Sequence, residues 1–427
     1  MTARAGGVRI SGAAAFVIAS SITASAQQGP TGPAKETQPP LIIQVGVDLI
    51  QLDASVTDKE GRPVADLRAE DFTLEIDGKK QPVSNASFFD SRSAAAATAS
   101  THSEPAELSP PRSVLFLIDD LNVSFFGMAS LRKDMQRFAE NWDSSDVMVG
   151  LRLTSDENPA VKLSRRPQAL RDSIEKLAFN LKGSQGGTSV PSLPGTSAIG
   201  ELSVSNSGNN PALERAIFQQ RVFSLLTTLN ALRAVPGRKA VVFVSEGFVF
   251  WEDPQGNERR QMRVSSPFST LFDDGSTGSA LRLVVEVANR ASVVIYTLDP
   301  SGLRGDGGSA ELPVASSLAA RKAATDVEIA NHFTLQEMAQ DTGGLSVYNR
   351  NDLKRGLRDA VDDQRSYYLI GFEPPKSAFE RASDKPRYHR IKLTVNRSDV
   401  RVRTRAGFYG VTDREVMKRA PLMVKSH

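Results

Sequence analysis

Residues 113–124 read Ser113-Val-Leu-Phe-Leu-Ile-Asp-Asp-Leu-Asn-Val-Ser124, an apolar run that ends abruptly in two carboxylates, an amide and a hydroxyl. The apolar part, residues 114–118, contains no alternating polar residue, so both of its faces must be covered. This pattern is typical of a central parallel strand with helices on both sides of the sheet. Ligands bind beyond the carboxyl ends of such strands, so the polar residues that follow are candidate site residues.

Three of these polar residues could hold a metal ion. Asp120, Asn122 and Ser124 place oxygen ligands at alternate positions of one loop. A turn could direct all three at one hard cation such as Mg²⁺. Acidic residues after a buried strand also form turns and cap the following helix, so the residues by themselves leave both interpretations open.

Length and composition limit the classes of protein to consider. The chain has 427 residues, enough for roughly two or three domains. Its 40% hydrophobic and 24% charged content is that of an ordinary globular protein, and a net charge of only +3 gives no argument for nucleic acid as a partner. The chain contains no cysteine, which excludes disulfides, thiol catalysis and zinc held by thiolates.

Residues 1–26 have the three parts of a secretory signal peptide. Arg4 and Arg9 come first, an apolar run follows in residues 13–22, and Ala24-Ser25-Ala26 supplies the small residues of a cleavage site. The apolar run is too short for a transmembrane anchor, which needs about 20 apolar residues. We therefore predict cleavage after Ala26 and a secreted or periplasmic protein with no transmembrane segment after cleavage.

Strand-like and helix-like segments alternate in residues 112–364. Further uninterrupted apolar strands are expected at residues 240–244 and 293–296, and each is followed by polar residues. This alternation predicts an α/β fold with a doubly wound, mostly parallel sheet. Residues 183–210, rich in Gly, Ser and Pro, are expected to form a mobile loop within this domain. Helices are expected at residues 129–142, 212–233, 281–290, 326–340 and 352–364.

Short strand-like segments precede and follow the α/β domain, in residues 41–90 and 365–412. A unit of about 50 residues buries too little apolar surface to be stable by itself. We therefore predict that the two segments pair to form one small β-sandwich, with the α/β domain inserted between them. Residues 27–40 and 91–111 have the composition of linkers, and residues 413–427 complete the chain as a tail.

The C-terminal strands are basic. Arg401, Arg403 and Arg405 alternate with Val400, Val402 and Thr404, which predicts a β-strand whose charged side faces solvent. Binding of an acidic polysaccharide or of lipid headgroups by these charges is the alternative.

The motifs and their order resemble the von Willebrand factor A (VWA) family, and in particular the secreted bacterial proteins described as VWFA-related acidobacterial-type proteins. The resemblance covers nearly the whole chain after the signal peptide. The segments that carry it are Val64-Ala-Asp-Leu-Arg-Ala-Glu-Asp-Phe72, Asp77-Gly78, Ile118-Asp-Asp-Leu-Asn-Val-Ser124, Pro236-Gly-Arg-Lys-Ala-Val-Val-Phe-Val-Ser-Glu-Gly247, Tyr296-Thr-Leu-Asp299, Thr342-Gly-Gly344 and Tyr367-Tyr-Leu-Ile-Gly-Phe372.

The resemblance implies a site for Mg²⁺ or another divalent cation, because VWA domains hold a metal with an Asp-x-Ser-x-Ser loop, a Thr in a second loop and an Asp after a later strand. Those roles would fall on Asp120, Asn122, Ser124, Thr188 and Glu246. The chain departs from the pattern in two places, since Asn122 replaces a Ser and the longer Glu246 replaces the Asp. An alignment that started at Asp119 would put Leu121 on a ligand position, and Thr196 competes with Thr188.

The resemblance also implies a function, a module that binds a protein partner, with the divalent cation completing the contact. An interaction or structural protein with an inactive metal site is the alternative. An enzyme is the least favoured class, because the chain has no Gly-x-Ser-x-Gly, no Gly-x-x-x-x-Gly-Lys and no His-Glu-x-x-His motif. His332 and His389 are isolated in the sequence, and we expect them at surface or capping positions.

Overall fold

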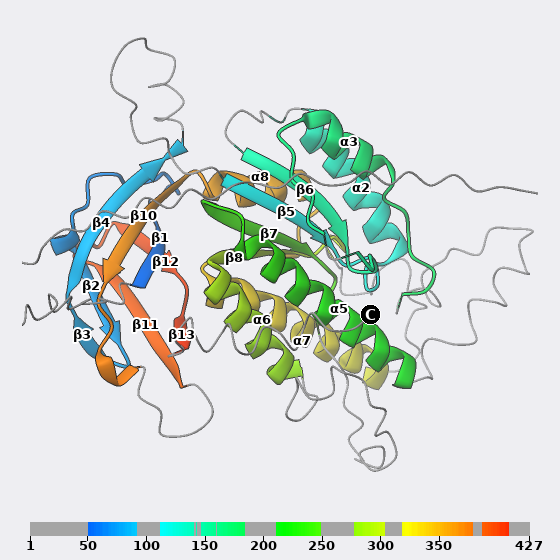
Figure 1. The fold of residues 1–427 in the computed structure, drawn as a ribbon. Helices are drawn as coiled ribbons and strands as arrows, with labels where there is room; N and C mark the ends of the chain where they lie inside the picture. The colour runs from blue at the N-terminus through cyan, green and yellow to red at the C-terminus, as the bar shows by residue number, and fades with distance from the viewer. Residues whose placement is uncertain are drawn as a thin grey trace, which may run out of the picture. The chain divides into compact units, whose positions relative to one another are not determined.

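A parallel sheet of five strands carries the candidate site (Figure 1). In this computed structural model the strands lie in the order β6-β5-β7-β8-β9. β5, β7 and β8 are buried along their whole length, which agrees with their uninterrupted apolar sequences. The strands are β5 (Arg112–Ile118), β6 (Val147–Leu153), β7 (Arg238–Val244), β8 (Val293–Leu298) and β9 (Ser346–Val347).

The structure describes most of the chain between residues 50 and 409. No helix in this described part is long and apolar enough to cross a membrane. Almost all of the predicted signal peptide, linkers, loop and tail lies outside it, so these assignments stay predictions. The described residues are 50–91, 112–140, 142, 147–158, 160–183, 211–248, 277–303, 318–378 and 387–409.

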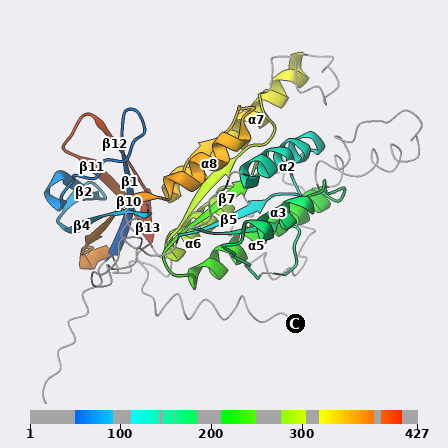
Figure 2. The ribbon, with the colours of Figure 1, turned by 90° about the horizontal axis from the view of Figure 1, so that it is seen from above.

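Helices pack against both faces of the sheet, because successive side chains of each strand point to opposite faces (Figures 1 and 2). On β5, Phe116 packs into the core formed with α2, α3 and α8, whereas Leu115 and Leu117 pack into the core formed with α5, α6 and α7. The first set is α2 (Phe125–Glu140), α3 (Pro167–Glu175) and α8 (Leu353–Asp363). The second set is α5 (Pro211–Arg233), α6 (Thr277–Ala291) and α7 (Leu318–Thr342).

Strands from both ends of the chain share two antiparallel sheets, with the orders β12-β1-β10-β4 and β13-β11-β2-β3. β1 pairs with β10 and β12, and β2 pairs with β11. The inward side chains of the two sheets, among them Leu52, Leu74, Tyr368 and Phe372, form one buried core. The strands are β1 (Ile50–Asp58), β2 (Phe72–Ile76), β3 (Lys79–Gln81), β4 (Val83–Asp90), β10 (Ser366–Phe372), β11 (Tyr388–Val395), β12 (Val400–Thr404) and β13 (Gly407–Tyr409).

The predicted mixed α/β class, with a parallel sheet flanked by helices and additional antiparallel strands, is confirmed. Three helices begin earlier than expected, α2 at Phe125 instead of residue 129, α6 at Thr277 instead of residue 281 and α7 at Leu318 instead of residue 326. The first turn of α2 carries Phe125 and Phe126 on its exposed side. The apolar spacing that marks the buried side of the helix therefore starts only after this turn.

Two expectations about polar side chains are wrong. Arg401 is exposed as expected, but Arg403 and Arg405 are only partly exposed, and their guanidinium groups donate hydrogen bonds to the backbone carbonyls of Gly343 and Asn289. His389 is not at the surface, because it is buried in the β-sandwich, where Nδ1 lies 2.9 Å from Asp77 Oδ2. Alternation shows which side chains share a face of a strand, but it does not show whether another element covers that face.

Candidate functional site

Polar residues follow three neighbouring strands at the carboxyl end of the parallel sheet. Asp119 and Asp120 follow β5, Ser245 and Glu246 follow β7, and Asp299 follows β8. All five are buried. The backbone holds them at the same level, since Asp119 N donates to Val244 O (2.8 Å) and Ser245 N donates to Leu298 O (3.0 Å). The buried strands therefore bring these side chains together, as expected for a parallel sheet.

Asp119 lies at the centre of this group and is fully buried. Its Oδ2 accepts hydrogen bonds from Arg221 Nε (2.8 Å) and from Ser245 Oγ (2.7 Å). Its Oδ1 lies 3.0 Å from Thr154 Oγ1. Arg221 comes from α5 and is itself buried, so the two residues form a buried ion pair whose remaining lone pairs are satisfied by hydroxyl groups. No local sequence pattern predicts this pair, because its members are far apart in the chain.

Asp120 bonds to residues at the end of β6 and beyond it. Its carboxylate accepts hydrogen bonds from Ser155 N (3.0 Å), Ser155 Oγ (2.5 Å) and Asn180 Nδ2 (2.8 Å), and Thr154 Oγ1 lies 3.1 Å away. The carboxylate thus ties the loop after β5 to the segment around Asn180. Gly183 belongs to the same segment, where an added Cβ would lie 2.6 Å from Leu121 O, so the two loops are in close contact.

The side chain of Glu246, which follows β7, lies beside the first turn of α2. Its Oε1 accepts hydrogen bonds from the backbone N of Ser124 (3.0 Å) and from Ser124 Oγ (2.6 Å). Ser124 Oγ in turn accepts a hydrogen bond from Gly127 N (3.0 Å), as an N-capping side chain does. Gly127 allows this approach, because a Cβ there would lie 2.1 Å from Glu246 Oε1. A carboxylate is also favourable beside the positive end of the helix dipole.

The structure brings together only part of the predicted metal-ligand set. Glu246 contacts Ser124, and Asn122 Nδ2 donates to the carbonyl of Gly247 (3.0 Å). Asp120 instead bonds to Thr154, Ser155 and Asn180. Thr188 lies outside the described residues.

These polar groups satisfy one another. A cation would have to displace the hydrogen bond between Ser124 and Glu246 and the donors that surround Asp120. The described residues also contain no group of three or more His, Asp and Glu side chains arranged to hold a metal ion. The donor set, in the arrangement seen here, does not fit a metal ion without rearrangement.

A second polar pair at this end of the sheet was not expected. His332 Nε2 lies 2.9 Å from Asp299 Oδ2, and its ring stacks on Tyr348 at 4.7 Å between centroids. The neighbouring Asn331 packs against Gly247, where a Cβ would lie 2.1 Å from the Asn331 side chain. These contacts place the middle of α7 over the ends of β7 and β8. His332 therefore orders the helix over the sheet, and its partner Asp299 is in one of the segments that carried the family resemblance.

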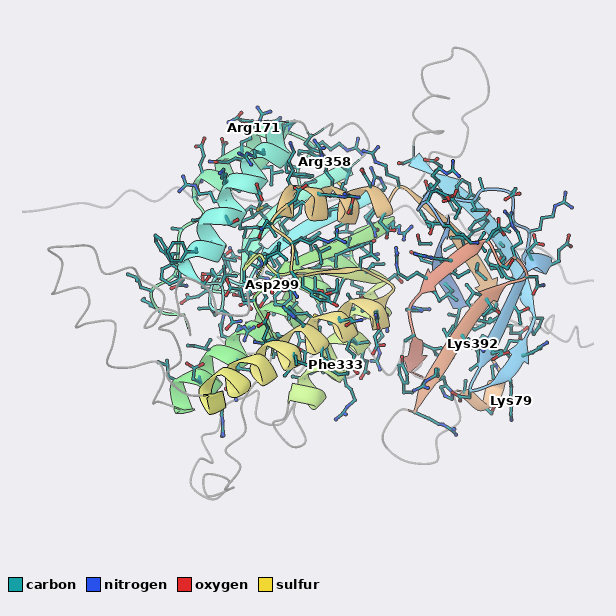
Figure 3. All side chains as sticks on the ribbon, turned by 180° about the vertical axis from the view of Figure 1, so that it is seen from behind. Lys79, Arg171, Asp299, Phe333, Arg358 and Lys392 are labelled. Carbon is teal, nitrogen blue, oxygen red and sulfur yellow. The ribbon has the colours of Figure 1, made fainter. Side chains whose placement is uncertain are left out.

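The carboxyl end of the sheet also carries exposed hydrophobic side chains. Those at the start of α2 belong to one aromatic cluster, in which the ring of Phe125 lies 5.5 Å from Phe126 and 5.7 Å from Phe179. On α7, Phe333 follows the edge residue His332 and points outward, and Figure 3 labels both Phe333 and Asp299. In the described part of the chain, the large hydrophobic side chains that are exposed are Phe125, Phe126, Leu181, Leu303, Ile329, Phe333 and Tyr348.

No family model matches the chain, and no curated protein matches it either. Among solved structures, the chain is similar to the pilus adhesin SpaC from Lactobacillus rhamnosus GG in its open conformation, with a TM-score of 0.33 and 10% sequence identity. The match covers 71% of this chain but only 38% of the adhesin. At that level of similarity, any functional conclusion depends on the geometry of the site itself.

Proposed function

We propose that the protein is a secreted or periplasmic VWA-type module that binds a protein partner at the carboxyl end of its parallel sheet and catalyses no reaction. The observation that carries this proposal is the distribution of exposed hydrophobic side chains. In the described residues they occur in the segments after β8 and β9, in the segment after α3, in the first turn of α2 or on α7 close to His332. Exposed apolar and aromatic side chains gathered in one region are typical of a protein-binding surface.

The residues that resemble metal ligands have a different role in this proposal. Glu246 and Ser124 fix the first turn of α2, which carries Phe125 and Phe126. Asp120 holds Asn180, whose neighbour Leu181 is exposed. The polar network therefore orders the apolar side chains before a partner arrives, and this reduces the entropy lost on binding.

Site-specific photo-crosslinking tests the proposal. A photoreactive phenylalanine analogue replaces Phe126 or Phe333 in the full-length protein inside the producing cell. The control positions are Lys79 and Lys392, which are exposed on the β-sandwich (Figure 3). We expect a discrete protein adduct from the first two positions and none from the controls. The same adducts from all four positions, or no adduct at all, would overturn the proposal.

A metal-dependent form of the same module is the alternative, and titration calorimetry with Mg²⁺ and Mn²⁺ separates the two. Our proposal expects no heat of binding from the wild-type protein. A binding signal that is lost in both Asp120→Ala and Ser124→Ala would establish a metal site at the positions that the family resemblance implies. The aromatic surface would then act together with a cation.

A further inference from the structure

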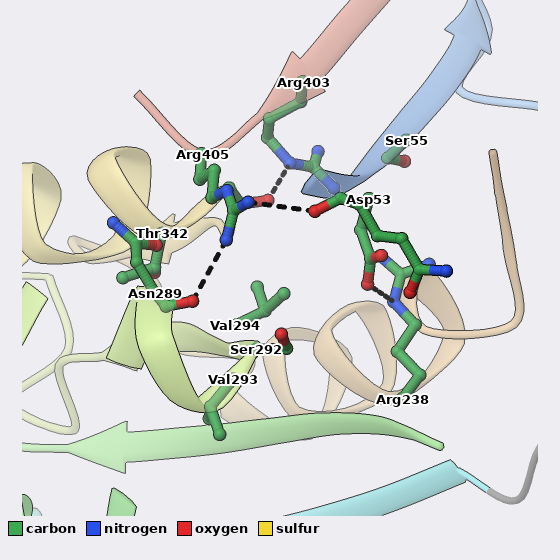
Figure 4. Close-up of a pocket in the computed structure, with 12 residues that line it drawn as sticks. Asp53, Ser55, Arg238, Asn289, Ser292, Val293, Val294, Thr342, Arg403 and Arg405 are labelled. Carbon is green, nitrogen blue, oxygen red and sulfur yellow. Dashed lines mark hydrogen bonds and ion pairs between the residues drawn. The ribbon is translucent and has the colours of Figure 1, made fainter. Parts of the chain in front are cut away.

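The opposite, amino end of the parallel sheet encloses a cavity of about 30 Å³ next to the β-sandwich (Figure 4). Its walls include Asp53 from β1, Arg238 from the start of β7, and Arg403 and Arg405 from β12 and the residue after it. Three guanidinium groups therefore face one small space with a single carboxylate among the lining residues.

Two of the arginines bond to the ends of helices. Arg403 Nε donates to Gly343 O (2.8 Å), just after α7, and its Nη2 pairs with Asp363. Arg405 Nη1 donates to Asn289 O (3.0 Å) in the last turn of α6, and its Nη2 donates to Gln51 O (2.9 Å). Cations are favourable beside the carbonyl ends of helices. These bonds occupy all the nitrogens of Arg405 except Nε.

The remaining donors have no acceptor. Arg238 Nε and Nη1 and Arg405 Nε are buried and make no hydrogen bond in the described part of the chain. Only 5% of Arg238 is exposed, so solvent does not satisfy it. Asp53 Oδ2 lies 3.9 Å from Arg238 Nε, which is too far for a hydrogen bond. The centre of the Tyr367 ring lies 4.1 Å from the guanidinium carbon of Arg238. This cation–π contact stabilises the positive charge, but it provides no acceptor for the in-plane N–H groups.

Positive charge exceeds negative charge around the cavity. Arg403 is paired with Asp363, which leaves Asp53 opposite Arg238 and Arg405, and the next residue in the chain, Lys239, is also buried. Burial lowers the pKa of Arg405 and that of Lys239, and in both cases Asp53 opposes the effect. Unpaired buried N–H groups and uncompensated buried charge are both destabilising. An acceptor that carries negative charge would relieve both.

We propose that this cavity binds a small inorganic anion, chloride, between Arg238 and Arg405. The cavity volume of about 30 Å³ is large enough for such an ion, because a single water molecule needs only about 10–15 Å³. The bound anion would accept hydrogen bonds from Nη1 of Arg238 and from Nε of Arg405, whereas Nε of Arg238 keeps Asp53 as its nearest carboxylate. It would thereby stabilise the packing of the β-sandwich against the amino end of the sheet.

Thermal unfolding of the full chain tests the proposal, with chloride replaced by gluconate at constant ionic strength. We expect the unfolding midpoint to be about 2–4 °C higher in chloride. The shift should disappear in Arg238→Gln and remain in the control Arg358→Gln, which removes the same charge from an exposed position on α8. Equal midpoints of the wild-type protein in the two salts would overturn the proposal, and so would a chloride shift that survives in Arg238→Gln.

A direct measurement covers the case in which Arg238→Gln does not fold. Crystals of the wild-type protein are soaked in bromide, and anomalous scattering locates the ion. We expect a peak between the guanidinium groups of Arg238 and Arg405. The lack of a peak there, with ordered water in the cavity instead, would refute anion binding.

Discussion

The two ends of the parallel sheet differ in what they leave unsatisfied. At the carboxyl end the carboxylates of Asp119, Asp120 and Glu246 all accept hydrogen bonds, whereas large apolar side chains around them stay exposed. At the amino end the described residues leave no large apolar side chain exposed, whereas Arg238 and Arg405 keep buried N–H groups that have no acceptor among those residues. One end thus exposes apolar surface, and the other buries positively charged N–H donors.

This difference explains why the two ends have different roles in our proposals. A surface whose polar groups are already satisfied gains most from a partner that buries apolar area. A buried cluster with excess positive charge gains most from an acceptor that fits inside it. The chemistry of the strand ends therefore points to a protein partner at one end and to a small ion at the other.

The largest effect is expected from removing the strands that cover the amino end. Deletion of residues 366–427 takes away β10, which lies between β1 and β4, and β11, which pairs with β2. The N-terminal strands then lose both their hydrogen-bond partners and half of their shared core. We expect amide exchange protection across residues 50–90 to be lost. Deletion of residues 413–427, which removes no described strand, is the control. Protection that survives the longer deletion would show that the two segments fold independently.

At the carboxyl end, Asp119→Ala should have the next largest effect. The variant leaves the buried guanidinium of Arg221 without its carboxylate, and breaking a buried pair in this way costs about 3–5 kcal/mol. As a control, Asp359→Ala breaks the exposed pair with Arg355 and should cost at most about 1 kcal/mol. Chemical denaturation gives both free energies of unfolding. Similar small losses in the two variants would mean that Asp119 does not hold this end of the sheet together.

Alkaline pH should weaken the amino end through Tyr367. Burial raises the pKa of its phenol to about 12, with Asp53 adding to the effect and Arg238 opposing it. The folded state thus favours the neutral phenol. The contribution of Tyr367 to folding stability is therefore complete below about pH 10 and is lost as the pH rises to about 12. The free energy of unfolding should fall by on the order of 2 kcal/mol over this range. In Tyr367→Phe the free energy of unfolding should fall less steeply with pH. The same slope in the variant and in the wild-type protein would refute this assignment.

The sequence predicted the elements more successfully than it predicted their contacts. Uninterrupted apolar runs identified the buried strands, and the polar residues after them marked the carboxyl end of the sheet. The pairing of Asp119 with Arg221 could not be predicted, because nothing local links a strand end to a helix residue far along the chain. For the same reason the alternation in β12 suggested solvent around Arg403 and Arg405, although α6 and α7 end against them. Asp120 was chosen by its spacing in the motif, yet Asp119 is the buried centre of the network.

The smallest effect on stability should come from the exposed aromatic side chains at the carboxyl end. Phe126 is 47% exposed, so Phe126→Ser should change the free energy of unfolding by no more than about 0.5 kcal/mol. Phe116→Ala is the matched comparison, because this side chain is fully buried beneath α2 and its truncation should cost about 3–5 kcal/mol. Denaturant unfolding measures both, and the adduct formed by crosslinking from Phe333 reports on binding. In Phe126→Ser we expect little change in stability and a weaker adduct, because the exposed part of this side chain adds little to the isolated fold beyond its ring contact with Phe125. A loss of stability above about 1 kcal/mol would instead show that Phe126 serves mainly to stabilise its own chain, and the carboxyl end would then lose its distinction as the open end of the sheet.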